Sequence, residues 1–127
     1  MTFLDKYQSQ ILGILRIVAG LLFLEHGCVK LLHFPTSMPI PPGNIGMLIM
    51  AAGIIELVGG ALITIGLFSR IAAFIASGEM AFAYWMVHVP KGGFYPVLNG
   101  GGEAILFCFV FLYLAAAGPG AWALNRR

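Results

Sequence analysis

Four long hydrophobic stretches follow one another along the chain, and each carries one glutamate. A helix crosses a bilayer in about 20 residues. The pattern therefore predicts four transmembrane helices, over residues 11–32, 44–67, 70–89 and 98–117. Two segments rich in proline or glycine, residues 33–43 and 90–96, read as loops, and Pro90 is expected to end the third helix. The predicted fold class is all-α: an integral membrane four-helix bundle that forms a single domain over residues 1–127.

The composition supports a membrane protein and argues against a soluble domain, a nucleic-acid-binding protein and several classes of enzyme. The chain is 60% hydrophobic and 9% charged, with a mean hydropathy of +0.94, whereas soluble domains carry about 25% charged residues. The net charge is only +2 and the basic residues are scattered, so no nucleic-acid partner is expected. The two cysteines stand apart, without a CxxC pair, and no dinucleotide fingerprint or nucleophilic triad is present. We therefore expect the lipid bilayer as a partner and no covalently bound cofactor.

The distribution of positive charge predicts the orientation. With four crossings both termini lie on one side, and that side collects Lys6, Arg70, Arg126 and Arg127. Cytoplasmic segments carry an excess of Lys and Arg, so both termini are predicted to be cytoplasmic. Arg16 and Arg70 are expected to anchor helix ends at this interface, with their charged heads reaching out to water.

The spacing of charges suggests an internal repeat. In the first and third stretches an arginine precedes a glutamate by nine residues, and the stretch that follows has one glutamate beside glycines. The residues concerned are Arg16 with Glu25, Arg70 with Glu79, and then Glu56 and Glu103. Two repeated helical hairpins, related by an axis along the membrane normal, would give this pattern. The match is short, and coincidence is the competing explanation.

The four glutamates in the hydrophobic stretches mark the candidate functional residues. A carboxylate in the hydrocarbon region costs roughly 2.5–3.5 kcal/mol on insertion scales, so each must face inward, be paired, be protonated or have a use. Small residues on the face of Glu56 predict that it points at another helix. The candidate residues for ligand binding or proton relay are Glu25, His26, Glu56, Glu79 and Glu103, with His88 and Asn99 at the outer mouth of the cluster.

Several uses of this cluster remain open. Interhelical hydrogen bonds would make it structural, although such bonds contribute only about 0.6 kcal/mol on average in membranes. A carboxyl group in low dielectric keeps a proton, and with a neutral histidine it can hydrogen-bond a quinone oxygen and carry protons. A di-iron site needs a Glu-x-x-His spacing, which is absent because Glu25 and His26 are adjacent, so no metal is assigned. A path for an ion or a solute is the remaining alternative.

Three segments resemble the DoxX family: LRIVAGLLFLEHGCVKL at residues 15–31, the run from IIELVGG to WMVHVP at residues 54–90, and LNGGGEAILFCFVFLYLAAAGPG at residues 98–120. The resemblance implies a bacterial inner-membrane protein of four helices. The family takes its name from a subunit of a thiosulfate:quinone oxidoreductase, and other members are tied to membrane redox and oxidative-stress assemblies. The matching motif positions, to which the family assigns no firm catalytic role, are Arg16, Glu25, His26, Gly27, Lys30, Glu56, Gly59, Gly60, Arg70, Glu79, His88, Asn99, Gly100 and Glu103.

The hypothesis from the sequence is a subunit or partner of a quinone-linked membrane redox system. Its polar cluster would bind a quinone-like molecule or relay protons, and the chain would at most be one subunit of an oxidoreductase. The alternative is a non-catalytic accessory subunit that stabilises a larger membrane complex. A wider relationship of the family to eukaryotic cargo receptors keeps a binding role open. A larger protein complex or a homo-oligomer is the expected protein partner.

Overall fold

The regular structure of the chain is entirely helical. The computed structural model describes residues 2–127, and no strand occurs in that range. The elements are α1 (Thr2–Asp5), α2 (Gln8–Leu31), α3 (Asn44–Ile65), α4 (Ser69–Ala83), the π-helix η1 (Tyr84–His88), α5 (Val89–Gly92), α6 (Pro96–Asn99) and α7 (Gly102–Ala117). The prediction of an all-α protein is confirmed. By length and composition, α2 and α3 can each cross a membrane, and α7 is a shorter apolar helix.

The third helical segment is longer than the sequence predicts. It runs through α4, η1 and α5 without a break from Ser69 to Gly92, so the expectation that Pro90 ends it is wrong. Pro90, which has no N–H to donate, is the second residue of α5. The π turn just before it changes the hydrogen-bond register. The segment ends instead at Gly93, which has a φ of 88°.

The fourth hydrophobic stretch is broken near its start. The short helix α6 ends at Gly100, which has a φ of 73°, and α7 begins only at Gly102. Glycine is favoured at such a left-handed position because a Cβ would be strained there. The regular helix therefore starts a few residues after Leu98, where the hydrophobic pattern placed it.

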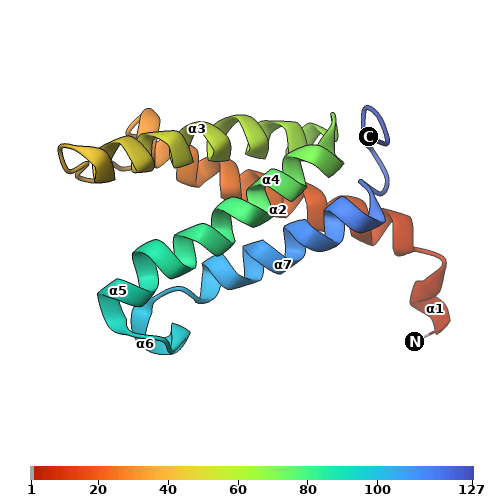
Figure 1. The fold of residues 1–127 in the computed structure, drawn as a ribbon. Helices are drawn as coiled ribbons and strands as arrows, with labels where there is room; N and C mark the ends of the chain where they lie inside the picture. Colours follow the sequence, from red (N-terminus) through yellow and green to blue (C-terminus); the bar gives the residue numbers. More distant parts are fainter. Residues whose placement is uncertain (1) are drawn as a thin grey trace.

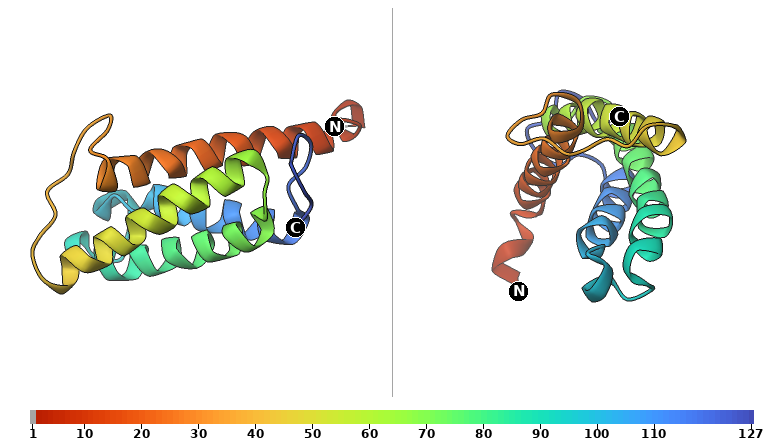
Figure 2. Two further views of the ribbon diagram at one scale, coloured as in Figure 1. Left: turned by 90° about the horizontal axis from the view of Figure 1, so that it is seen from above. Right: turned by 90° about the vertical axis from the view of Figure 1, so that its left-hand side faces the viewer.

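The long helices form two pairs. Helix α2 packs along α3, α4 lies beside α7, and α3 joins the pairs by packing on α4 (Figure 1). Viewed end-on, α2 and α7 are spread apart beneath α3, so the four helices form an arch (Figure 2). Both termini lie at the same end of this arch (Figure 2).

Glycines bring the backbones of α2 and α3 into contact. A Cβ atom added at Gly27 would lie 2.5 Å from the amide nitrogen of Leu57, and one added at Gly60 would lie 2.6 Å from that of Leu24. Small residues allow this approach of helices in a membrane protein. Glu56 lies on the same buried face of α3 and is 1% exposed, which confirms that it points at another helix.

Three phenylalanine rings connect α2 to the second pair. Phe23 of α2 lies with its centroid 4.8 Å from that of Phe111, and Phe107 stacks on Phe111 at 5.4 Å. Phe23 and Phe111 are fully buried. Within the second pair, the Ser77 hydroxyl of α4 donates to the Cys108 carbonyl of α7 at 2.7 Å. The core thus lies between α2, α4 and α7, under α3.

Arg16 lies inside the protein and not with its charged head in water. Its side chain is fully buried, and its guanidinium donates to the carbonyls of Pro119 (2.5 Å), Ala121 (2.9 Å) and Trp122 (3.1 Å). The expectation that Arg16 reaches out to water is therefore wrong. The C-terminal segment folds back against α2 and supplies carbonyl groups that lie outside any helix. These carbonyls replace water as the partners of the guanidinium.

Arg70, the counterpart of Arg16 in the suggested repeat, also binds the C-terminal part of the chain. Its Nη1 donates to the carbonyls of Ala115 (3.1 Å) and Ala116 (2.8 Å), and its Nε donates to that of Arg126 (3.1 Å). The last carbonyls of a helix have no intrahelical partner, and a basic side chain satisfies them here. Both arginines therefore fasten the end of the chain to the helices.

We predict that Arg16→Ala releases the C-terminal segment. Its amides at Ala121 and Leu124, which donate to Ser9 at 2.9 Å and Ile65 at 3.2 Å, should exchange with deuterium many times faster. Amide exchange followed by mass spectrometry measures this. Arg127→Ala, at an exposed position, is the control and should leave these rates unchanged. Unchanged protection in Arg16→Ala would contradict this role.

We also predict opposite effects for two glycine substitutions. Gly60→Ala should destabilise the protein by about 1–3 kcal/mol, because the new methyl group meets backbone atoms of α2 that cannot yield. Gly78→Ala is the matched control, since nothing lies within 4 Å of a Cβ at that helical position. It should stabilise by roughly 0.5–1 kcal/mol through its helix propensity. Denaturant unfolding in detergent measures both, and equal effects would argue against backbone contact at Gly60.

Candidate functional site

The structure divides the seven candidate residues into separate groups. His26 pairs with Glu103, Glu56 and Glu79 meet between helices, and His88 lies with Asn99 near the α5–α6 loop. Glu25 is exposed and makes no hydrogen bond or ion pair with residues 2–127. The single cluster expected from the sequence is thus resolved into distinct sites along the helices.

His26 of α2 and Glu103 of α7 form a polar pair between two helices whose backbones stay apart. The Nδ1 atom lies 2.8 Å from the Leu22 carbonyl oxygen, and Nε2 lies 3.0 Å from Oε1 of Glu103. A carbonyl only accepts, so Nδ1 carries its hydrogen and donates it to Leu22. One further proton then lies between Nε2 and Oε1, and the pair is neutral overall in either arrangement of that proton. The side chains are 39% and 60% exposed, so the pair remains accessible.

An apolar groove adjoins this pair. It has a volume of about 270 Å³ and lies between α2 and α7. Its lining is made of apolar side chains and one carboxyl group, namely Leu15, Val18, Ala19, Leu22, Leu106, Phe107 and Val110 together with Glu103. A concave apolar surface with very few polar groups is the usual form of a small-molecule site.

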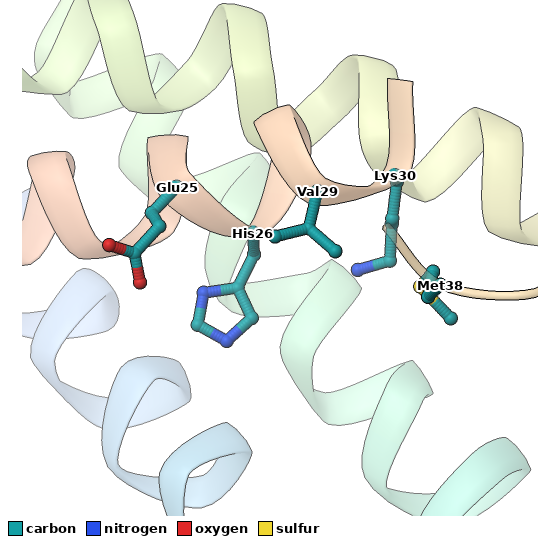
Figure 3. A pocket seen from close by; sticks show the side chains of 5 residues that line it. All are labelled: Glu25, His26, Val29, Lys30 and Met38. Carbon is teal, nitrogen blue, oxygen red and sulfur yellow. The ribbon is translucent and has the colours of Figure 1, made fainter. Parts of the chain in front are cut away.

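A second, smaller cavity lies on the other side of His26. It has a volume of about 110 Å³ and is lined by Glu25, His26, Val29, Lys30 and Met38 (Figure 3). The Glu25 carboxyl group lies beyond the imidazole ring as seen from Lys30 (Figure 3). The volume is enough for a few water molecules, each of which occupies about 30 Å³ in the liquid.

Lys30 supplies the partner of the most deeply buried glutamate. Its Nζ lies 2.5 Å from Oε1 of Glu56, and the side chains are 17% and 1% exposed. Glu79 of α4 lies beside both residues, and its Oε1 is buried without a hydrogen-bond partner among residues 2–127. Sequence reasoning placed Lys30 on the face of His26 but not among the site residues. A lone lysine four residues from a histidine in a membrane helix was the signal that could have included it.

His88 and Asn99 form hydrogen bonds that hold the α5–α6 loop against the end of the third helical segment. The Asn99 side chain is 2% exposed, and its Nδ2 donates to the Gly93 carbonyl at 2.7 Å and to the Tyr84 hydroxyl at 3.2 Å. Its Oδ1 accepts from the Gly101 amide at 2.7 Å. His88 bonds the Asn99 carbonyl through Nδ1 at 3.2 Å. Both polar atoms of the Asn99 side-chain amide are therefore occupied by hydrogen bonds to the loop and to Tyr84 beside it.

Across residues 2–127, no three His, Cys, Asp or Glu side chains gather in a way that could hold a metal ion. The pairs are instead formed by a base with an acid, imidazole with carboxyl and ammonium with carboxylate.

Two helices that are long and apolar enough to cross a membrane, with polar pairs within their length, are typical of an all-helical membrane protein. The sequence model of the DoxX family matches residues 11–89, and the chain belongs to that family. The match includes Glu25, His26, Lys30, Glu56 and Glu79. Glu103 lies outside the matched region.

Two relatives cover most of the chain. A protein of Haemophilus influenzae, described only as uncharacterized, is 45% identical over 130 residues, with 100% of this chain and 97% of that protein covered. An uncharacterized membrane protein of Mycobacterium tuberculosis, Rv3486, is 29% identical over 129 residues, with 89% of this chain and 78% of that protein covered. No solved structure matches the chain.

We predict that Asn99 is needed for stability. Asn99→Ala leaves the Gly101 amide and the Gly93 carbonyl without their partner, and each unmade buried bond costs about 1–3 kcal/mol. The free energy of unfolding in detergent should fall accordingly. Asn44→Ala, at an exposed position, is the control and should have little effect. Normal stability of Asn99→Ala combined with a loss of ligand binding would instead place Asn99 in a ligand site.

Proposed function

We propose that this protein is a four-helix bundle of the bacterial inner membrane that binds a quinone-type ring in the groove between α2 and α7. In this role it is a subunit or partner of a quinone-linked redox system. The observation that carries the proposal is the apolar groove with the His26–Glu103 pair at its polar end.

The chemistry of the groove fits a quinone ring. At about 270 Å³ it is just below the range of roughly 300–1,000 Å³ for ligand pockets. Its apolar walls suit the ring and the start of an isoprenoid tail, and Phe107 offers an aromatic surface. A quinone oxygen near the pair would accept the proton shared by His26 and Glu103. Reduction to the quinol needs two electrons and two protons. The His26–Glu103 pair supplies one proton, and a partner redox protein supplies the two electrons and the second proton.

The arrangement of the helices supports the proposed topology. Both termini lie at the same end, as an even number of crossings requires (Figure 2). The continuous segment from Ser69 to Gly92 is long enough for a third crossing, and α7 together with α6 supplies the fourth. The end with the termini also carries Arg70, Arg126 and Arg127, so we assign it to the cytoplasm.

A non-catalytic accessory role is the second candidate, and the same groove favours it. Because α2 and α7 do not close on each other, their apolar walls can accept a side chain from a partner helix as well as a ring. In that case the groove would be an assembly surface of a larger membrane complex.

The test is quinone binding to the protein in lipid nanodiscs, followed by native mass spectrometry with a short-chain benzoquinone and a naphthoquinone. Val18→Trp fills the groove and should weaken binding by roughly tenfold or more, a loss of about 1.4 kcal/mol. Leu21→Trp is the matched control, because Leu21 is 48% exposed against 50% for Val18 and does not line the groove. Glu103→Gln should also weaken binding, since the shared proton is removed.

Three outcomes separate the candidates. Binding lost in Val18→Trp and kept in Leu21→Trp supports the quinone site. No binding of either quinone, or equal binding by the two tryptophan variants, overturns it. Purification of the wild-type chain with a larger membrane subunit that Val18→Trp loses, without any quinone binding, supports the accessory role instead.

A further inference from the structure

Lys30, Glu56 and Glu79 form a group that the groove does not use. They come from α2, α3 and α4, and they meet where these three helices pack together. Glu56 is 1% exposed, Lys30 is 17% exposed, and Glu79 is half-buried with its Oε1 atom buried, so the group is largely shielded from its surroundings. A buried charge must be balanced by its neighbours, so the protonation of the whole group can be argued from its charges.

The charges balance only when the group holds one extra proton. The ammonium of Lys30 neutralises one carboxylate, which its 2.5 Å contact identifies as Glu56. If Glu79 were also ionised, a net negative charge would remain among apolar helices, where an uncompensated charge is unfavourable. The Oε1 atom of Glu79 is buried and receives no hydrogen bond within residues 2–127. An ionised carboxylate would leave that acceptor unsatisfied, whereas a protonated carboxyl group is neutral and can donate to its neighbour.

No other charged group takes the place of this proton. Lys30 and Glu56 are the charged residues that interact with Glu79. The titratable groups of α7 lie elsewhere: Glu103 contacts His26, Cys108 contacts Ser77, and Tyr113 is 58% exposed. The proton therefore belongs to the two carboxyl groups jointly, as in other closely coupled pairs.

The small cavity gives this proton a way in and out. Lys30 lines the cavity of about 110 Å³ (Figure 3). Its Nζ also contacts Glu56. His26 and Glu25 line the same cavity. Water molecules held there would connect the buried group with the His26 imidazole and with the exposed carboxylate of Glu25.

We propose that Lys30, Glu56 and Glu79 form a buried proton-binding site, in which the two carboxyl groups share one proton and exchange it through the cavity beside Lys30. Binding and release move one proton between a cavity water and the carboxyl pair, and no other bond is made or broken. The proposal does not depend on quinone binding in the α2–α7 groove.

Infrared spectroscopy of the protein in nanodiscs at neutral pH tests the shared proton, because a protonated carboxyl group has its own C=O stretch band. The difference spectra of wild type minus Glu79→Gln and of wild type minus Glu56→Gln should each contain one such band. In either variant the remaining carboxylate pairs with Lys30 and needs no proton. Wild type minus Asp5→Asn should contain none, because Asp5 is exposed and precedes the first hydrophobic stretch.

Substitution of Lys30 sharpens this test. Lys30→Gln removes the positive charge, so both carboxyl groups should be protonated and the band should grow to about twice its size. Lys30→Arg keeps the charge and should leave a single band. The amide bands of the same spectra report whether each variant is folded. The absence of a carboxylic acid band that depends on Glu79, or an unchanged band in Lys30→Gln, would overturn the proposal.

Transfer into D₂O tests the exchange path. The carboxylic acid band should shift as the proton is replaced, and Val29→Phe, which fills the cavity, should slow this shift severalfold. Val58→Phe, at a position that is 54% exposed on α3 and outside the cavity, is the control and should exchange like the wild type. Equal rates in the two phenylalanine variants would show that the proton does not pass through this cavity.

Discussion

The contact between the backbones of α2 and α3 is the constraint on which the rest of the structure depends. Glycines on both helices, such as Gly27 and Gly60, leave no space for a Cβ atom at the crossing. At that distance Lys30 of one helix reaches Glu56 of the other directly. Truncating one member of a buried pair costs about 3–5 kcal/mol, because a charge is then left uncompensated. Close packing and charge pairing therefore support each other at this interface.

The same contact explains why the structure is open on its other side. Helix α2 packs closely on α3, and α7 packs closely on α4. As a result α2 and α7 meet through side chains such as the rings of Phe23 and Phe111. The space left between them is the apolar groove, and the His26–Glu103 pair lies at its polar end. The two polar sites begin on one face of α2, because His26 and Lys30 are four residues apart and only about 40° apart around the helix. They line one cavity but reach different partners, His26 contacting Glu103 of α7 and Lys30 contacting Glu56 of α3.

Arginines at the end with the termini have a fastening role. Arg16 and Arg70 both donate to backbone carbonyls in the C-terminal part of the chain, and they turn a segment without regular structure into a fixed part of the protein. Main-chain groups inside a membrane protein need partners within the protein. The loop between α5 and α6 follows the same rule at the opposite end, where Asn99 satisfies both an amide and a carbonyl.

The sequence by itself determined the helical class, the approximate course of the long helices and the inward direction of Glu56, because hydrophobic stretches and small residues act locally along a helix. It also named most of the polar residues of the two sites. Only the tertiary structure decided their partners: Glu103 pairs with His26, and Asn99 holds the loop between α5 and α6. Arg16 was misplaced for the same reason, since its partners Pro119 and Trp122 come from a distant segment that no local pattern connects to it. Partner choice depends on the distance and rotation between helices, and these follow from packing across the whole fold.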